Sequence, residues 1–217
     1  MTDDKLFAKV LATKTIANVN ESLALSLNLP QGHRSIALIS ADMDDVTYTA
    51  LDAATKAANV KVSYARSMYA GAANASTALQ GEVIGILSSN NPEEVKSGLS
   101  AAIRFMESDG YFISVTDDDS VVCFAHTVSR TGSYLSEIAG IKEGEPLAYL
   151  IAPPLEAIYG LDAALKAADV KICQLFEPPS ETNFGGGLLT GTQSACRAAC
   201  NAFLSAVKQI AQNPKEV

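Results

Sequence analysis

The stretch "DMDD", Asp42 to Asp45, holds the carboxylates of this sequence that are best placed for binding chemistry. It follows an apolar run typical of a buried strand, so it falls where loops gather at a strand end. Carboxylates this close together could hold a small cation, with nearby donors or carbonyls to orient it. Adjacent aspartates are also typical of solvated turns and helix caps. The residues alone favour the turn or cap, and a binding site stays the alternative.

Other reactive residues give little support for catalysis or for a metal site. His126 lies near Ser129 and Ser133 in "HTVSRTGS", but no buried acid is assignable, and a hydrolytic triad is recognised by its geometry. Cys196 and Cys200 are spaced i, i+4 on an expected helix and could form half a metal site, but such sites usually need a second pair or nearby histidines. We therefore expect free thiols, no metal, no cofactor and no enzymatic activity.

Two further motifs have simple structural interpretations. The run "GGG" at Gly185 to Gly187 invites comparison with a phosphate-binding loop, but no lysine follows it, and close approach of backbones explains it better. The segment "TDDDS" from Thr116 is typical of a hairpin turn between two strands. Neither motif predicts a nucleotide site.

An internal repeat supplies the elements that position these residues. "LDAATKAANVK" from Leu51 and "LDAALKAADVK" from Leu161 are identical at nine of eleven positions, 110 residues apart in a chain of 217. The pattern predicts a helix with a narrow, alanine-rich face, and Asp52 and Lys56 are expected to face outward as an i, i+4 ion pair. Such a helix fits tight packing on a sheet, and its outer edge equally fits a neighbouring chain.

The elements around each repeat follow the same order. An apolar run precedes each helix and two more follow it, the last leading into another helix. The runs begin at Ser35, Val60 and Gly81 in the first half, and at Glu145, Val170 and Gly185 in the second. A strand and a short helix precede each set, from Val10 and from Cys123. The sequence therefore predicts an α/β (α+β) fold of two tandem domains, residues 1–109 and 110–217, each a mixed sheet with helices mainly on one face.

Composition limits the partners. The net charge is −8 and Lys and Arg are scattered singly, so we expect no nucleic-acid partner and no binding to an anionic membrane. No apolar run approaches the roughly 18–20 residues that span a bilayer, and the first residues lack the pattern of a signal peptide. We expect a cytoplasmic protein.

Long stretches of the chain resemble a known family. The "LDAALKAADVK" junction is similar to the signature of bacterial microcompartment shell proteins, and two such domains with a strand and helix moved to the front resemble their circularly permuted tandem form. "SADMDDVTYTALDAATKAANVKVSYARSMYAG", "VSRTGSYLSEIAGI", "PPSETNF" and "LLTGTQSACRAACNAF" closely resemble the ethanolamine-utilisation shell subunits of that form. The resemblance covers about Val10 to Pro214.

The resemblance implies a homotrimer whose six domains form a flat, pseudo-hexagonal tile. Such tiles pack edge to edge with other shell proteins around ethanolamine-degrading enzymes. The family implies a gated central pore for metabolites or cofactors, and a smaller acidic pore in each subunit that binds ethanolamine. It therefore implies a location in the microcompartment shell.

The resemblance also assigns site residues. Ethanolamine is a small cation with a hydroxyl group, which suits carboxylates with polar neighbours. The family's acidic lining falls on Asp44, Asp45 and Glu82, and its other small-pore positions fall on Phe112, Thr182, Asn183 and Phe184. The loops "SMYAGAANAST" from Ser67 and "ESDGYF" from Glu107 are gating candidates, with Tyr69 and Phe112 as plugs; ordinary surface loops explain them equally well.

Two other functions remain as alternatives. A soluble two-domain sensor of small amines would use the same acidic residues but would form no shell. An enzyme acting on ethanolamine or its aldehyde product would depend on His126. The oligomeric state distinguishes the tile from the sensor, and turnover distinguishes the enzyme from both.

Overall fold

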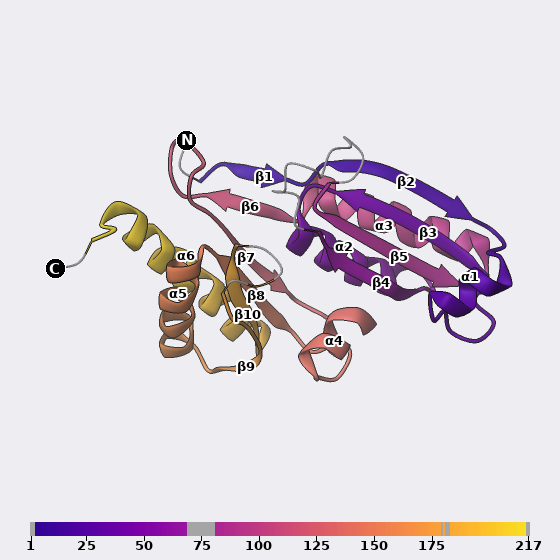
Figure 1. The fold of residues 1–217 in the computed structure, drawn as a ribbon. Coiled ribbons are helices and arrows are strands. Elements are labelled where there is room, and N and C mark those ends of the chain that lie inside the picture. Colours follow the sequence, from indigo (N-terminus) through magenta and orange to yellow (C-terminus); the bar gives the residue numbers. More distant parts are fainter. Residues whose placement is uncertain (1–2, 69–80, 179, 181–182, 216–217) are drawn as a thin grey trace. The chain divides into compact units, whose positions relative to one another are not determined.

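The computed structural model describes residues 3–68, 81–178, 180 and 183–215 (Figure 1). Tyr69 and Thr182 lie outside the described residues. Within them the elements are, in order, β1 (Lys5–Phe7), β2 (Val10–Ile16), α1 (Glu21–Ser26), β3 (Ser35–Ala41), α2 (Asp44–Ala57), β4 (Lys61–Ser67), β5 (Val83–Ser89), α3 (Pro92–Ser108), β6 (Tyr111–Ser114), β7 (Val122–Val128), α4 (Ser133–Ala139), β8 (Leu147–Ala152), α5 (Pro154–Ala167), β9 (Val170–Phe176), β10 (Gly185–Gly191) and α6 (Gln193–Gln212).

The chain forms two compact units. The N-terminal unit consists of Phe7–Gly110 together with Gly132–Leu135, and the C-terminal unit consists of the described parts of residues 1–6, 111–131 and 136–217. The short segment 132–135 therefore packs with the N-terminal unit, although it follows β7 in the sequence. The predicted boundary between residues 109 and 110 stays a prediction about where the duplicated halves join.

In the N-terminal unit, a four-stranded sheet carries a pair of helices. Its strand order is β2-β3-β5-β4, and α2 and α3 pack against each other and against the sheet (Figure 1). The buried side chains of this layer include Ile39, Leu51, Leu87 and Met106, each less than 2% exposed. Burial of such side chains is the main favourable contribution to folding.

The C-terminal unit repeats this arrangement. In its six-stranded sheet, of order β1-β6-β7-β8-β10-β9, the last four strands have the same order as the N-terminal sheet, and α5 and α6 pack together against them. One buried cluster joins both layers and includes Leu150 on β8, Leu161 on α5 and Phe203 on α6. The α/β fold with two tandem permuted domains is thus confirmed.

The strand directions explain how each repeated helix crosses its sheet. The sequence predicted mixed sheets. In the structure, β5 instead pairs antiparallel with both β3 and β4. Consequently β3 and β4, which α2 connects, run parallel to each other but do not pair, because β5 lies between them. The β8, β10 and β9 strands repeat this pattern.

Side-chain caps fix the starts of two helices, and the predicted hairpin turn is present. The Asn91 side chain accepts a hydrogen bond from the Glu93 N–H at 2.9 Å, with Pro92 as the first residue of α3. Thr192 caps α6 by accepting from the Ala195 N–H at 3.1 Å. The segment after Thr116 connects β6 and β7, which pair antiparallel as a hairpin.

One prediction about the repeated helix is wrong in an informative way. Asp52 and Lys56 form the expected ion pair, with 3.1 Å between Nζ and Oδ2, but Asp52 is fully buried and does not face solvent. Its carboxylate accepts hydrogen bonds from the Gly132 N–H at 2.8 Å and the Leu135 N–H at 2.9 Å. Burial of the Asp52 carboxylate is tolerated because these backbone N–H groups replace the hydrogen bonds that water would otherwise donate to it.

Candidate functional site

The predicted acidic residues begin at the N-terminus of α2. Asp44 and Asp45 are the first two residues of the helix, and both are buried, with exposed fractions of 8% and 7%. The Asp44 Oδ1 atom accepts a hydrogen bond from the Asp45 N–H at 2.9 Å. Carboxylates in a first helical turn are stabilised by the partial positive charge there. The pair is thus neither a solvated turn nor the N-cap, because both residues are buried and Met43 occupies the N-cap position without a side-chain hydrogen bond.

The neighbouring strands bring a third carboxylate, that of Glu82, to this end of the sheet. The Ser67 hydroxyl, at the end of β4, donates to Asp44 Oδ2 at 2.9 Å and also lies 3.3 Å from the Glu82 backbone oxygen. The Glu82 N–H donates to the Ala41 carbonyl at 2.8 Å, just before β5 begins. The end of β3, the start of α2, the end of β4 and the start of β5 thus converge here.

A glycine permits this convergence. Gly81 has a φ of +63°, and a Cβ atom at this position would overlap with the backbone oxygen of Ala41. The residue that precedes Glu82 must therefore adopt a left-handed conformation and approach β3 closely, which only glycine does at little cost.

The charges of neighbouring carboxylates act on Glu82. Glu82 lies at the surface, yet partial burial, followed by the negative charges of Asp44 and Asp42, raises its pKa above the ordinary value. Asp42 itself accepts a hydrogen bond from the Lys9 N–H at 2.7 Å. A cation placed beside Glu82 would offset this repulsion. We call Asp42, Asp44, Asp45 and Glu82 the acidic group.

The remaining described site residues lie in the C-terminal unit, where Phe112 and Phe184 belong to an aromatic cluster. Phe112 on β6 is only 6% exposed, and its ring centroid lies 5.3 Å from that of Phe124 and 6.3 Å from that of Phe184. Asn183 is exposed, and Phe184 accepts a backbone hydrogen bond from Ser180 at 3.1 Å. The buried Phe112 side chain thus packs in its unit, and its role as a plug stays a prediction.

Sequence reasoning missed two residues that shape the acidic group. Ser67 was considered only as part of a gating loop, whereas its hydroxyl orients Asp44. Asp42 was quoted in "DMDD" but received no role, although its charge contributes to the raised pKa of Glu82. Their signal was position, because Ser67 ends β4 and Asp42 directly follows β3.

The cysteines are spread through the C-terminal unit. Cys196 and Cys200 lie in its buried cluster, where Cys200 accepts a hydrogen bond from the Thr127 hydroxyl at 3.3 Å. Burial raises the pKa of Cys200 to about 11 and that of Cys123 to about 12. Among the described residues, no three His, Cys, Asp or Glu side chains are grouped in a way that suits a metal ion.

None of the described helices has the length and hydrophobicity to cross a bilayer.

Comparison with known proteins identifies the family. No family model matches the chain. The bacterial microcompartment shell protein EutL of Clostridium perfringens is 62% identical over 214 residues, which cover 99% of this chain and 99% of that protein. This chain belongs to the EutL family. Its relatives are shell proteins of the bacterial microcompartment, and the predicted family and its location in the shell are confirmed.

Two further EutL proteins agree. EutL of Escherichia coli K12 is 54% identical over 211 residues, covering 97% of this chain and 96% of that protein. The crystal structure of EutL from Leptotrichia buccalis matches with a TM-score of 0.97 and 63% identity, and the match covers 100% of both chains. The similarity to EutL, in sequence and in fold, therefore extends over the whole length of those proteins.

Proposed function

We propose that this shell protein forms a homotrimeric, pseudo-hexagonal tile that packs with other shell proteins and has no enzymatic activity. The tile would carry a gated central pore for metabolites or cofactors and would bind ethanolamine at a small pore in each subunit. The observation that carries the ethanolamine proposal is the convergence of Asp44 and Glu82 at the strand ends beside α2, where the Ser67 hydroxyl contacts both residues.

The chemistry of the acidic group suits a small ammonium ligand. Ethanolamine carries one positive charge, and bringing it beside Glu82 replaces repulsion between carboxylates by attraction. The Ser67 hydroxyl and the backbone carbonyls of Ala41 and Glu82 supply polar groups of the kind that orient a hydroxyl. The family's other small-pore positions, Phe112, Thr182, Asn183 and Phe184, stay part of the proposal.

Calorimetric titration of ethanolamine tests the site. Glu82→Gln and Asp45→Asn should each weaken binding by roughly tenfold or more, since each removes a carboxylate charge next to the ammonium. The control is Glu93→Gln, because Glu93 lies exposed on α3 of the same unit. Unchanged affinity in both site variants would contradict the proposed site.

Sedimentation of the purified chain tests the tile separately. Three copies of the 22.7 kDa chain give a mass of about 68 kDa. A stable species of that mass would support the tile. A monomer that persists over a wide concentration range would instead favour the small-amine sensor, which uses the same acidic group without assembly.

A further inference from the structure

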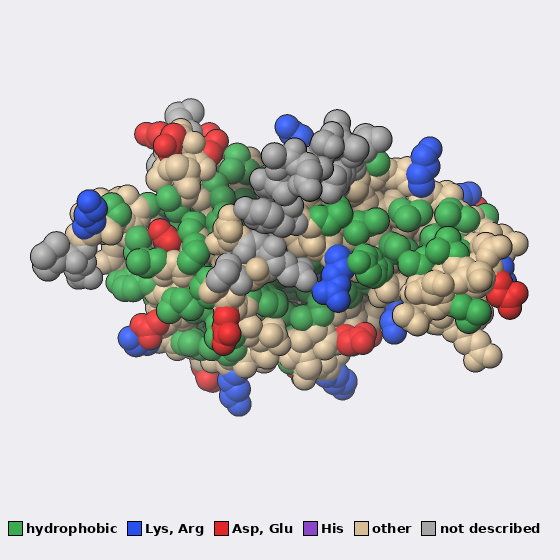
Figure 2. Space-filling model, viewed as in Figure 1, with side chains coloured by type: hydrophobic (Ala, Val, Ile, Leu, Met, Phe, Trp, Pro, Cys, Tyr) green, Lys and Arg blue, Asp and Glu red, His purple; other side chains and the backbone are tan. Residues whose placement is uncertain are grey.

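The outer face of α5 is unusually apolar for a surface helix. Leu155, Ile158, Tyr159 and Leu165 have exposed fractions of 63%, 50%, 45% and 36%. Their spacing places them on neighbouring turns, so they form one stripe along the helix. Figure 2 shows hydrophobic side chains at the surface in the region where Figure 1 places α5. An apolar surface of this kind marks an interaction site more often than an accident.

The internal repeat identifies which surface this stripe corresponds to. The bounds of α2 and α5 differ by 110 residues, so Thr49 corresponds to Tyr159 and Asp52 to Asp162. Thr49 is 1% exposed and Asp52 is fully buried, whereas the Asp162 side chain is 59% exposed. The same face of the same helix is therefore covered in one copy of the repeat and open in the other.

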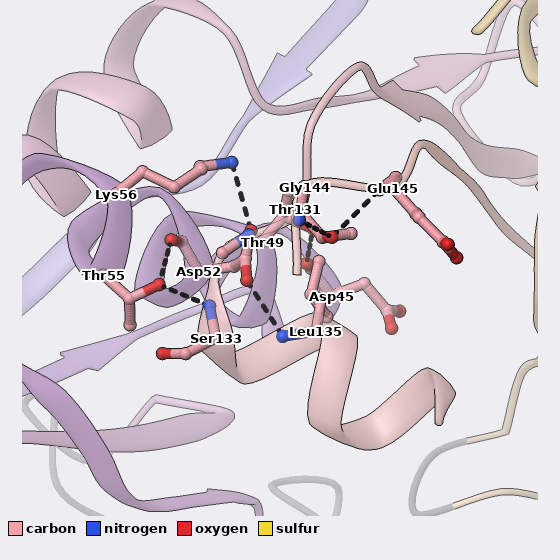
Figure 3. Close-up of polar contacts among 11 residues, drawn as sticks. Asp45, Thr49, Asp52, Thr55, Lys56, Thr131, Ser133, Leu135, Gly144 and Glu145 are labelled. Carbon is pink, nitrogen blue, oxygen red and sulfur yellow. Dashed lines mark hydrogen bonds and ion pairs between the residues drawn. The ribbon is translucent and has the colours of Figure 1, made fainter. Parts of the chain in front are cut away.

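The cover on α2 is the segment Gly132–Leu135. Besides the two backbone hydrogen bonds to Asp52, the Ser133 N–H donates to the Thr55 hydroxyl at 3.1 Å. The rings of Tyr48 and Tyr134 lie 6.4 Å apart between centroids. Figure 3 shows Asp52, Thr55 and Lys56 facing the backbone of this segment. Polar and aromatic contacts thus seat the segment on α2.

The counterpart of this covering segment is residues 20–23. The strands β2 and β7 are offset by 112 residues, and so are the starts of α1 and α4. Matching backbone bonds support this alignment, because the Val19 N–H donates to Arg34 and the Thr131 N–H donates to Glu145. In this alignment Leu23 corresponds to Leu135. Leu135 is 1% exposed, but Leu23 is 45% exposed.

We propose that the α5 face of one copy binds residues 20–23 and α1 of a second copy of this chain. Asp162 would then accept hydrogen bonds from the backbone of Asn20 and Leu23, as Asp52 does from Gly132 and Leu135. Ile158 and Tyr159 would cover Leu23, and Leu25, which is 72% exposed, would lie beside them. Neither surface is covered within its own unit, and a second copy of the chain presents the matching one.

This contact joins two different surfaces, so each copy binds one neighbour through α5 and another through α1. A heterologous contact of this type closes into a ring when the rotation between copies permits it. The inference rests on the proposed trimeric tile and names the surface through which it assembles.

Sedimentation of three forms of the full chain tests the surface. Ile158→Asp introduces a charge into the proposed contact and should raise the dissociation constant of the trimer by at least about 100-fold. Ile172→Asp is the matched control, because Ile172 is 45% exposed on β9 of the same unit and lies outside the stripe. Asp162→Asn should weaken assembly by roughly tenfold.

A photoreactive residue identifies the occupant. With p-benzoylphenylalanine in place of Ile158, irradiation of mixed light and isotope-labelled chains should join position 158 to the peptide around residues 20–26 of another copy. A trimer that survives Ile158→Asp, or a cross-link to a different segment or protein, overturns the inference and leaves the tile intact. A monomeric unaltered chain would contradict the tile itself.

Discussion

Removal of the Asp52 carboxylate is the sharpest test of how the segment Gly132–Leu135 is held. In Asp52→Ala, the Gly132 and Leu135 N–H groups lose their acceptor in a fully buried place. An unsatisfied buried donor costs about 1–3 kcal/mol, so the two together predict a loss of about 2–6 kcal/mol. Lys56 adds little to this, because it is partly exposed and stays hydrated. Asp52→Asn keeps one acceptor and should lose about 1–3 kcal/mol.

Urea denaturation at one fixed chain concentration measures these losses, because any assembly makes the stability depend on concentration. The control is Lys96→Ala, which breaks an exposed ion pair with Glu93 and should change the free energy of unfolding by less than about 1 kcal/mol. If Asp52→Ala unfolds cooperatively with a loss no larger than that of the control, the assignment of Asp52 as the anchor of this segment is refuted.

Three further predictions concern charge, backbone and thiols. Because the pKa of Glu82 is raised in the folded state, the folded protein loses stability as the pH rises from the ordinary Glu pKa through the raised one. In urea titrations, Glu82→Gln should therefore be more stable than the parent at pH 7 and equal to it below about pH 4. Gly186 has a φ of +156° and a Cβ there would overlap with a backbone oxygen of β8, so Gly186→Ala should cost about 2 kcal/mol or more in the same assay. In alkylation followed by mass spectrometry, Cys173, which is partly exposed, should react before Cys123 and Cys200, whose burial raises their thiol pKa to about 12 and about 11; modification of a buried cysteine first would contradict the packing.

The fold was predictable because its determinants are local and repeated. Short apolar runs predicted the buried strands, and an alanine-rich periodic pattern predicted the repeated helix. The length of the repeated junction indicated a duplication. Strand pairing was harder, since the position of β5 between β3 and β4 depends on contacts that no local pattern records.

The candidate site was only partly predictable for the same reason. Asp44 and Asp45 are adjacent in the sequence, but the effect of Asp42 on Glu82 depends on how three strand ends meet. The burial of Asp52 was missed because an i, i+4 pair with Lys56 predicts an exposed helix face. Only a segment 80 residues further along the chain, beginning at Gly132, explains why this face is covered.

The two copies of the repeated helix give the strongest reason to expect assembly. Asp52 and Asp162 occupy the same position, and each pairs with a lysine four residues later. In the first copy the carboxylate also anchors a backbone segment, whereas in the second it lies beside exposed Ile158 and Tyr159. A helix that remained exposed to solvent would gain nothing from large apolar residues on its outer face. The second copy therefore has the composition of a surface that is covered in the working protein, and a second chain presents the matching segment.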